Sequence, residues 1–388
     1  MMFVKLVTKV SNLLAICLTT DAFNGLRTQQ SLKYELQKCH TPIAVLEIGG
    51  DVSPNNDPDG SVASLALLRV AKQLISSTNQ GLEVDELIWE DVSPWARLCD
   101  SLSSALREGR EIKADLHVEA IKAMAALSRL VPNLQQNWKP YLKEFQSQSS
   151  QLIGLFEPHH LSGLKFAYDC FQTVSSHDLC FPSDLQVAYD DLDLPFRIVP
   201  CCLSKSGIDD LSVNLLASQV RFQVDDIRTT SNRVVKERRQ TAWEGEDHVP
   251  PFQYSGKSME RQPWSPLVKE IRDAVLQKTG EDYDCCLLNL YPDGGSGMRY
   301  HIDPDQGTLW DYSTAVVSVG ATRRFALRET PRDGVPTSQP HTFVLMEGDV
   351  TEMFGDCQNR FQHTVKKADN KTEAVPRASL VFKRTFSG

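Results

Sequence analysis

The chain has 388 residues, of which 41% are hydrophobic and 23% are charged. This balance is typical of a folded globular protein and excludes a disordered or fibrous chain. The length is sufficient for two ordinary domains, each with its own core. The net charge of −9 excludes a surface that attracts polyanions everywhere, so any contact with nucleic acid must come from a local basic patch. No apolar run reaches the ~18–20 residues that a membrane span needs.

The first thirty residues carry few charges around a short apolar core at 13–18. This composition fits a secretory-type signal or an organellar transit peptide, and it fits an ordinary N-terminal helix equally well. We therefore treat residues 1–30 as a candidate targeting leader and leave them out of the fold. We expect an intracellular protein, located in the nucleus, the cytoplasm or an organelle.

Residues 33–182 predict an all-α helical domain. Apolar side chains recur at helical spacing over 65–75, 116–131 and 161–171, and Pro132 ends the second of these patterns. No repeat period is clear enough to name a solenoid family. His159 and His160 lie at a helix entrance and read as surface polar residues, because no third metal ligand stands at a useful spacing. A protein partner is the role that we expect for this domain.

The acidic stretch 184–195 is the expected domain boundary, and residues 195–388 change in character. One amphipathic helix begins at the N-cap Ser265 with Pro266 in its first turn, and Gly280 ends it. Short β-rich runs follow, separated by turns rich in Gly, Asp and Pro. These runs are 285–290, 314–319, 324–328, 342–346, 350–353 and 378–384. The pattern predicts an α+β chain whose second domain is a β-sandwich or a double-stranded jelly roll.

The second domain also carries a set of metal-ligating residues. His301 and Asp303 are two residues apart, so on a strand both side chains point to the same face, and His363 follows on a later β-rich segment. Two imidazoles and one carboxylate can hold Fe(II) and leave positions open for a co-substrate and oxygen. Arg377 opens the last predicted strand and can bind the far carboxylate of a dicarboxylate. Together these residues indicate a non-haem Fe(II), 2-oxoglutarate-dependent dioxygenase.

Many short motifs follow one another in this part of the chain. They are 238–246, 252–256, 263–264, 289–291, 301–305, 318–323, 348–349, 353–355, Gln358, His363 and 377–383. With this order and spacing, residues 234–386 resemble the AlkB-like dioxygenases, which are oxidative nucleic-acid demethylases. The resemblance does not reach the helical domain, and it implies that the second domain is a double-stranded β-helix (jelly roll).

The resemblance also implies roles for individual residues. His301, Asp303 and His363 would bind the iron and be catalytic. Asn289 and Tyr291 would hydrogen-bond 2-oxoglutarate, and Arg377 would hold its distal carboxylate. The family usually has a second arginine at the position of Lys383, where lysine keeps the charge but loses the bidentate geometry. We carry Lys383 over as a further contact to 2-oxoglutarate.

Three residues are carried over as contacts to the substrate. Asp305, four positions after His301, would contact the target base, and Tyr254 and Phe252 would offer the aromatic faces that a flipped base needs. Packing within a hairpin is the alternative role of the two aromatic residues. The basic run 228–239 precedes this segment and could contact phosphates, or it could be an ordinary solvated face.

We therefore expect a dioxygenase that uses Fe(II), with 2-oxoglutarate and O2 as co-substrates, to demethylate N-alkylated bases in DNA or RNA. Such a reaction, which can serve DNA repair, releases formaldehyde and succinate. One alternative is a 2-oxoglutarate-dependent hydroxylase of a protein or a small molecule. Another is a non-catalytic protein whose helical half binds a partner. We expect a monomer that does not associate with membranes and whose partner is alkylated DNA or RNA.

Overall fold

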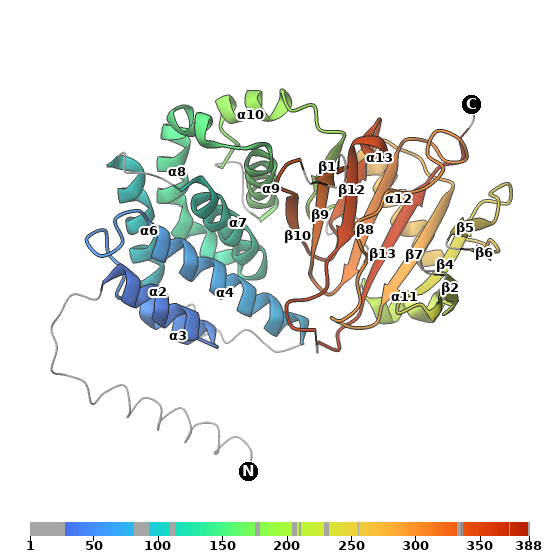
Figure 1. Cartoon of the computed structure of the whole chain (residues 1–388), viewed down its shortest axis with the longest axis horizontal. Helices are drawn as coiled ribbons and strands as arrows, with labels where there is room; N and C mark the ends of the chain where they lie inside the picture. The colour runs from blue at the N-terminus through green and yellow to red at the C-terminus, as the bar shows by residue number, and fades with distance from the viewer. Residues whose placement is uncertain are drawn as a thin grey trace, which may run out of the picture.

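The structure is a computed structural model, and it describes residues 28–80, 93–108, 113–174, 179–203, 208, 211–228, 233–254, 256–331, 335, 337–371 and 373–386. Helices form the N-terminal part and β-sheets the C-terminal part, and the two parts lie side by side (Figure 1). The chain is therefore a mixed α and β protein with a helical N-terminal region, as predicted. Most of the candidate leader, residues 1–27, lies outside the described residues.

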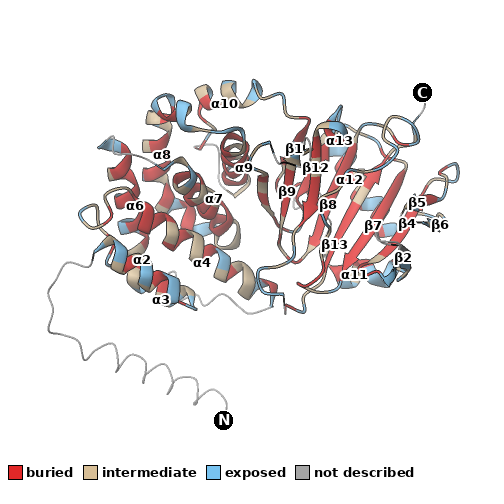
Figure 2. Ribbon diagram, viewed as in Figure 1, coloured by how far each residue is buried: buried red, intermediate tan, exposed pale blue. Residues whose placement is uncertain are grey.

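The helical part contains each of the three helices whose spacing the sequence shows. These are α4 (Ser61–Asn79), α7 (Ala114–Leu130) and α9 (Pro158–Val174), and both α4 and α9 pack on α7. Leu74 of α4, Ile121 and Leu127 of α7 and Leu164 of α9 are buried, whereas Leu65, Leu68 and Ile75 of α4 are half-buried, and all three helices carry buried residues in Figure 2. The other helices and 3-10 turns are α2 (Gln29–Lys38), α3 (Pro42–Gly49), α6 (Ser93–Arg107), η1 (Pro132–Leu134), α8 (Gln135–Leu152), η2 (Ile153–Leu155) and α10 (Ser183–Asp190). Within the described residues, no helix has the length and apolarity needed to cross a membrane.

The acidic stretch that we expected to be a domain boundary is partly helical. Helix α10 buries Leu185 completely and packs on α8 and α9. The carboxylate of Asp184 accepts hydrogen bonds from the hydroxyls of Ser149 and Ser150 on α8. Acidic residues can stand in this helix because they lie on its outer face, and one of them bonds to a neighbouring helix.

Two antiparallel sheets form most of the C-terminal part. The larger has the strand order β1-β11-β8-β13-β7-β4, and the smaller has the order β10-β9-β12. Their strands are β1 (Phe196–Val199), β4 (Gln240–Gly245), β7 (Cys285–Tyr291), β8 (Thr314–Gly320), β9 (Arg323–Glu329), β10 (His341–Leu345), β11 (Val350–Met353), β12 (Phe361–Val365) and β13 (Arg377–Lys383). Tyr291 and Val316 of the larger sheet share one core with Phe325 and Leu327 of the smaller sheet. The six predicted strands match β7 to β11 and β13 to within about one residue at each end.

The outer face of the larger sheet is covered by helix α12 (Pro266–Thr279). Ile271 and Val275 of α12 pack with Leu288 and Leu380, so alternate residues of β7 and β13 face the helix and the others face the smaller sheet. The helix ends at Gly280, whose φ of +78° favours glycine. Ser265 occupies the N-cap position, but its hydroxyl donates to Glu244 and does not cap the helix.

The remaining elements lie around these sheets. They are α11 (Val213–Gln219), the hairpin β2–β3 (Asp226–Arg228 and Val234–Lys236), the hairpin β5–β6 (Phe252–Tyr254 and Lys257–Met259) and the short helix α13 (Cys357–Arg360).

The helical part is joined to the sheets by buried polar contacts. Arg129 of α7 donates two hydrogen bonds, of 2.9 and 2.7 Å, to the carboxylate of Asp349, which has no exposed side-chain surface. Ser162 of α9 bonds to His341 of β10 at 2.7 Å. A buried ion pair costs about 3–5 kcal/mol when one partner is removed. These contacts therefore hold the helices in a defined position against the sheets.

Candidate active site

The three predicted metal ligands converge in space. His301 and His363 form an isolated backbone bridge, and their ring centroids are 4.2 Å apart. Oδ1 of Asp303 lies 3.6 Å from Nε2 of His301 and 3.7 Å from Nε2 of His363. One ligand atom from each residue lies within 4.8 Å of the other two. The arrangement provides two nitrogens and one oxygen around a common point, which suits a divalent iron.

Asp303 reaches this point from a turn. We expected His301 and Asp303 to share a strand, but only His301 bridges to β12, and the residues after it are irregular. The backbone amide of Asp303 donates to the side-chain oxygen of Gln358 on α13 at 2.8 Å. That hydrogen bond, rather than strand alternation, helps to fix the position of Asp303.

The charges around the three residues also suit a metal. Burial, together with the neighbouring His301, lowers the pKa of His363 to about 3, so its ring is neutral at pH 7. Burial alone would raise the pKa of Asp303, but Lys383 and the two histidines hold it well below its usual range. Neutral imidazole and ionised carboxylate are the forms that bind metals.

Lys383 contacts Asp303 directly. Its Nζ lies 2.6 Å from Oδ2 of Asp303, and its side chain is almost completely buried. The other carboxylate oxygen of Asp303 is the one that faces the two imidazoles. The structure thus pairs Lys383 with a predicted metal ligand. The contact of Lys383 to 2-oxoglutarate, which the family resemblance implies, stays a prediction.

A cavity of about 90 Å³ opens next to the triad. Strand β7 contributes Asn289 and Tyr291, and β13 contributes Ser379, all on the face that is turned away from α12. Apolar side chains from both sheets complete the wall, namely Leu287, Val316, Phe325, Val365 and Val381. The wall therefore combines a few polar atoms with a dry surround, as expected of a site for a small co-substrate.

Several buried polar atoms in and beside this cavity have no partner among the described residues, although Arg377 is not among the residues that line it. These atoms are Oδ1 of Asn289, Oγ of Ser379, and Nε and Nη1 of Arg377. Arg377 pairs with Tyr291 in the strand register and donates a hydrogen bond from Nη2 to Ser318 at 2.8 Å. Burial lowers the pKa of Arg377 to about 10, so it is still a cation at pH 7. A buried guanidinium with two nitrogens that have no partner fits the carboxylate of a bound 2-oxoglutarate.

Sequence reasoning missed the position of Arg239. We placed it in a basic run that could meet phosphates, but its side chain is buried and lines the cavity. It donates from Nε to Glu237 at 2.5 Å and lies 5.3 Å from the ring centroid of Tyr254. The feature that could have placed Arg239 is its position directly before β4, because β4 pairs with β7 beside the cavity. Arg233, Lys236 and Arg238 of the same run are exposed.

The three predicted substrate contacts have different surroundings. Tyr254 lines the cavity, and its hydroxyl donates to Glu237 at 2.8 Å. Phe252 touches the cavity but is buried, with its ring centroid 4.9 Å from that of Trp243, which agrees with the hairpin-packing alternative. Asp305 is exposed on a turn, has a φ of +62° and is not among the residues that line the cavity. The structure therefore places Tyr254, but not Asp305, in the wall of the cavity.

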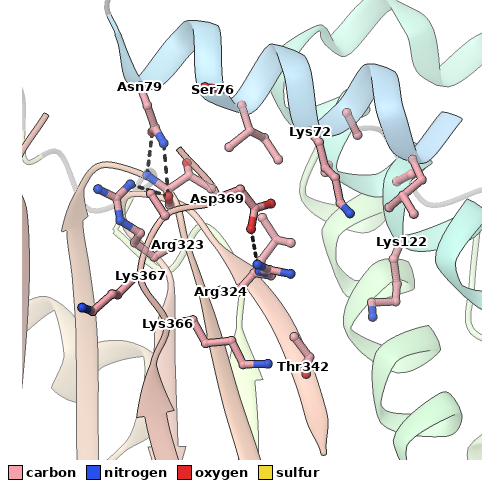
Figure 3. A pocket seen from close by; sticks show the side chains of 18 of the residues that line it. Lys72, Ser76, Asn79, Lys122, Arg323, Arg324, Thr342, Lys366, Lys367 and Asp369 are labelled. Atoms are coloured by element: carbon pink, nitrogen blue, oxygen red, sulfur yellow. Dashed lines mark hydrogen bonds and ion pairs between the residues drawn. The ribbon is translucent and has the colours of Figure 1, made fainter. Parts of the chain in front are cut away.

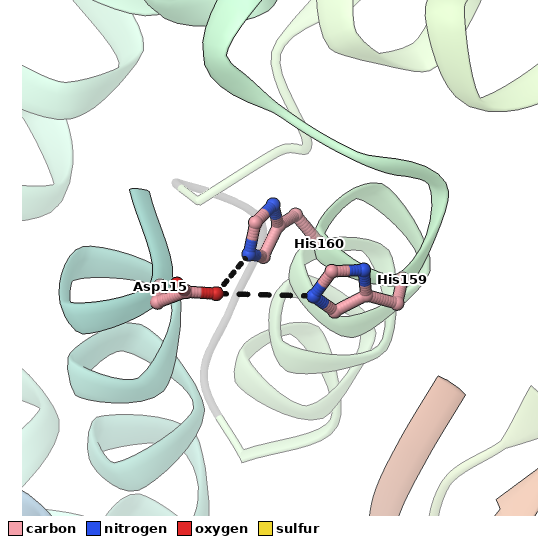
Figure 4. Close-up of side chains that lie close together, drawn as sticks. All are labelled: Asp115, His159 and His160. Atoms are coloured by element: carbon pink, nitrogen blue, oxygen red, sulfur yellow. Dashed lines mark hydrogen bonds and ion pairs between the residues drawn. The ribbon is translucent and has the colours of Figure 1, made fainter. Parts of the chain in front are cut away.

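A second group of potential ligands comes together in the helical part. Asp115 of α7 is the third group that the sequence did not reveal beside His159 and His160 (Figure 4). Its Oδ1 lies 2.7 Å from Nε2 of His160 and 3.9 Å from Nε2 of His159. The Nδ1 atom of His160 accepts a hydrogen bond from the backbone amide of Glu157. A neutral His160 therefore carries its proton on Nε2, where it bonds to Asp115, and the group joins two helices.

The comparisons with known proteins place this site in a family. The model of the 2OG-Fe(II) oxygenase superfamily matches residues 195–383. An uncharacterized protein of Acanthamoeba polyphaga mimivirus is 29% identical over 172 residues, which are 44% of this chain and 86% of that protein. Alpha-ketoglutarate-dependent dioxygenase alkB homolog 3 of Bos taurus is 30% identical over 202 residues, 50% of this chain and 68% of that protein. The chain belongs to the AlkB-like 2-oxoglutarate- and Fe(II)-dependent oxygenases.

DNA oxidative demethylase ALKBH2 of Bos taurus is also similar, with 27% identity over 136 residues, 34% of this chain and 48% of that protein. As an AlkB-like oxygenase, the chain is a 2-oxoglutarate-dependent dioxygenase that uses Fe(II) and O2. The predicted family, enzyme class and cofactors are confirmed, and the alternative of a non-catalytic protein is set aside.

Proposed function

We propose that this AlkB-like oxygenase oxidatively demethylates N-alkylated bases in DNA or RNA. The proposal rests on the convergence of the His301, Asp303 and His363 side chains beside a cavity that Tyr254 also lines. The DNA oxidative demethylase among its relatives supports the same substrate class. We further propose that the two facing sheets form a double-stranded β-helix (jelly roll).

Each group at the site has a role in this reaction. His301, Asp303 and His363 would hold Fe(II), which with 2-oxoglutarate and O2 supplies the oxidant that hydroxylates an N-methyl group, giving succinate, CO2 and, on release of the hydroxymethyl group, formaldehyde. Lys383 positions Asp303 by holding its second carboxylate oxygen. The apolar walls exclude water from the reacting atoms.

The co-substrate would be held on the inner face of β7 and β13. Arg377 would bind the distal carboxylate of 2-oxoglutarate through its guanidinium, whose Nε and Nη1 atoms have no partner among the described residues. Ser318 fixes the guanidinium by accepting its third hydrogen bond. Asn289 and Tyr291 would hydrogen-bond the same molecule from the adjacent strand.

The target base would be held by the ring of Tyr254. Its hydroxyl bonds to Glu237, and Nζ of Lys257 lies 4.4 Å from its ring centroid, so the ring has a fixed orientation. A fixed aromatic face is what a base extruded from a stack needs. The exposed cations Arg233, Lys236 and Arg238 lie on and beside β3. From there they could neutralise phosphates of the nucleic-acid strand that carries the target base. Asp305 and Phe252 stay candidate substrate contacts.

The test is a turnover assay on the purified full chain. Fe(II), 2-oxoglutarate and a panel of N-methylated DNA and RNA oligonucleotides would be supplied, with formaldehyde and succinate measured together. We expect formaldehyde in proportion to a methylated oligonucleotide, and no product from His301→Ala. Tyr254→Phe should keep most of the activity because the ring remains, whereas Tyr254→Ala should lose it at subsaturating oligonucleotide.

The outcomes separate the proposal from its main alternative. Succinate formed with a protein or small-molecule acceptor, but without formaldehyde from any oligonucleotide, would favour a hydroxylase of that acceptor.

The helical domain at 33–182, the catalytic domain at 195–388, the leader at 1–30 and the monomeric state stay predictions. Size-exclusion chromatography with light scattering tests the last of them.

A further inference from the structure

A pocket separate from the active site lies between the helices and the smaller sheet. Its volume is about 310 Å³. Helices α4 and α7 form one wall, and residues on and beside β9, β10 and β12 form the other (Figure 3). Arg324 of β9 lines this pocket, while the next residue, Phe325, lines the active-site cavity. Strand alternation therefore puts the two cavities on opposite faces of the smaller sheet.

Six cationic side chains line this pocket, and four of them face one another from its two walls. Lys72 comes from α4 and Lys122 from α7, and they face Arg324 and Lys366 across the space (Figure 3). Lys366 lies next to Arg324 because its backbone amide donates to the Arg324 carbonyl oxygen at 2.8 Å. Clustering of like charges from separate elements is costly unless an anion is bound among them.

Acidic side chains compensate only part of this charge. Glu119 pairs with Lys122 at 2.5 Å, and Asp369 pairs with Arg324. Within the described residues, no ion pair is made by Lys72 or Lys366. Burial lowers the pKa of Lys366 and the neighbouring Arg324 lowers it further, with Asp369 acting in the opposite direction. Lys72 and Lys366 therefore leave two positive charges without a partner between the walls, besides the exposed Lys367 at the edge of the lining, and a phosphate dianion would match the two.

Glu373 does not neutralise these cations, although it also lines the pocket. Its carboxylate accepts hydrogen bonds from Ser76 and Asn79 of α4. It also pairs with the buried Arg323 at 3.4 Å. The charge of Glu373 is thus neutralised by Arg323, and these contacts connect α4 to the start of β9.

Part of the remaining pocket wall is apolar, beside the polar Thr322 and Thr342. Leu68 and Ile75 of α4 and Val344 of β10 are half-buried and line it, together with Ala123 and Ala126 of α7. A volume of about 310 Å³ falls in the range of small-molecule sites and is much larger than a bare phosphate requires. A fitting ligand would therefore have an anionic head and an apolar body.

We propose that this pocket binds a small organic phosphate, with the phosphate among Lys72, Lys122, Arg324 and Lys366 and its apolar part against Leu68, Ile75 and Val344. Lysine ammonium groups act as point charges, which suit a phosphate better than a planar carboxylate. Such a ligand would bridge the helices and the sheet. This site is independent of the proposed demethylase activity, so either can fail without the other.

Calorimetric titration of the purified full chain tests the proposal, with hexyl phosphate and inorganic phosphate as probes. We expect hexyl phosphate to bind at least about tenfold more tightly, because its chain buries apolar surface. Lys366→Met and Lys72→Met should each weaken it by about three- to tenfold. Lys143→Met is the matched control, because Lys143 is an exposed lysine of α8 that does not line the pocket. It should leave the affinity unchanged.

Asp369→Asn provides a test in the opposite direction. The Asp369 side chain is 60% exposed, so the fold should tolerate the change, and removal of its charge frees Arg324. We expect hexyl phosphate to bind several-fold more tightly to this variant. Absence of binding to the native chain, equal binding by Lys366→Met, or weaker binding by Asp369→Asn would each overturn the proposal. Displacement of the probe by a short single-stranded oligonucleotide at lower concentration would assign the pocket to nucleic acid instead.

Discussion

Arg377 offers a test in which stability and co-substrate binding should change in opposite directions. Arg377 is 1% exposed, and among the described residues Ser318 is the one hydrogen-bond partner of its guanidinium. Burial lowers its pKa to about 10, and a displacement of that size corresponds to about 3 kcal/mol against the charged form. This cost is present at pH 7 and would be offset only when a carboxylate binds. Replacement by methionine, which has a similar length and no charge, should remove the cost.

We therefore expect Arg377→Met to raise the free energy of unfolding of the protein without 2-oxoglutarate. The gain should be at most about 3 kcal/mol, reduced by about 1 kcal/mol for the lost hydrogen bond to Ser318. The same variant should lose two charge-assisted hydrogen bonds to 2-oxoglutarate. At about 1.5–3 kcal/mol each, this loss raises the apparent KM for 2-oxoglutarate by about 10²-fold or more.

Urea denaturation at pH 7, with and without 2-oxoglutarate, measures the first effect, and initial rates over a range of 2-oxoglutarate concentrations measure the second. Arg384→Met is a suitable control, because Arg384 is a partly exposed arginine beyond the end of β13 that pairs with Asp311. It should change stability by less than about 1 kcal/mol and leave the KM unchanged. A less stable Arg377→Met protein with an unchanged KM would refute the reasoning.

Three further predictions follow from buried ionisable groups. Lys383→Met should weaken iron binding by about 10- to 100-fold, because Asp303 loses the cation that orients it. The pKa of Asp303 should also rise, so the variant should release iron at a higher pH on acidification. Equilibrium dialysis measures both effects. Arg129→Met should lower the unfolding free energy by about 3–5 kcal/mol, because it leaves Asp349 as a buried unpaired charge, and the double variant with Asp349→Asn should recover part of this loss in urea melts. Burial lowers the pKa of His341 to about 4, so its ring is neutral in the folded protein, whereas the unfolded chain takes up a proton below about pH 6.5. Stability should therefore fall by up to about 3 kcal/mol as the pH is lowered from about 6.5 to about 4, and His341→Leu should flatten this part of the denaturation profile.

Local patterns in the sequence determined much of the catalytic part. Short β-rich runs between turn residues located β7, β8 and β13, because both faces of these strands pack in apolar surroundings. The order of His301, Asp303, His363 and Arg377 indicated the chemistry, since two imidazoles, a carboxylate and a guanidinium are together the groups that bind Fe(II) and a dicarboxylate. Apolar residues at helical spacing likewise located the helices α4, α7 and α9.

The tertiary structure alone decided the contacts between distant segments. Lys383 meets Asp303 across 80 positions, Asp115 meets His160 across 45, and Arg239 enters the cavity through the pairing of β4 with β7. Such contacts leave no periodic mark in the sequence, because each partner is compatible with its own local segment whether or not the other is near. The phosphate pocket is of the same kind, since its cations come from four separate segments that approach each other only when the helices pack on the smaller sheet.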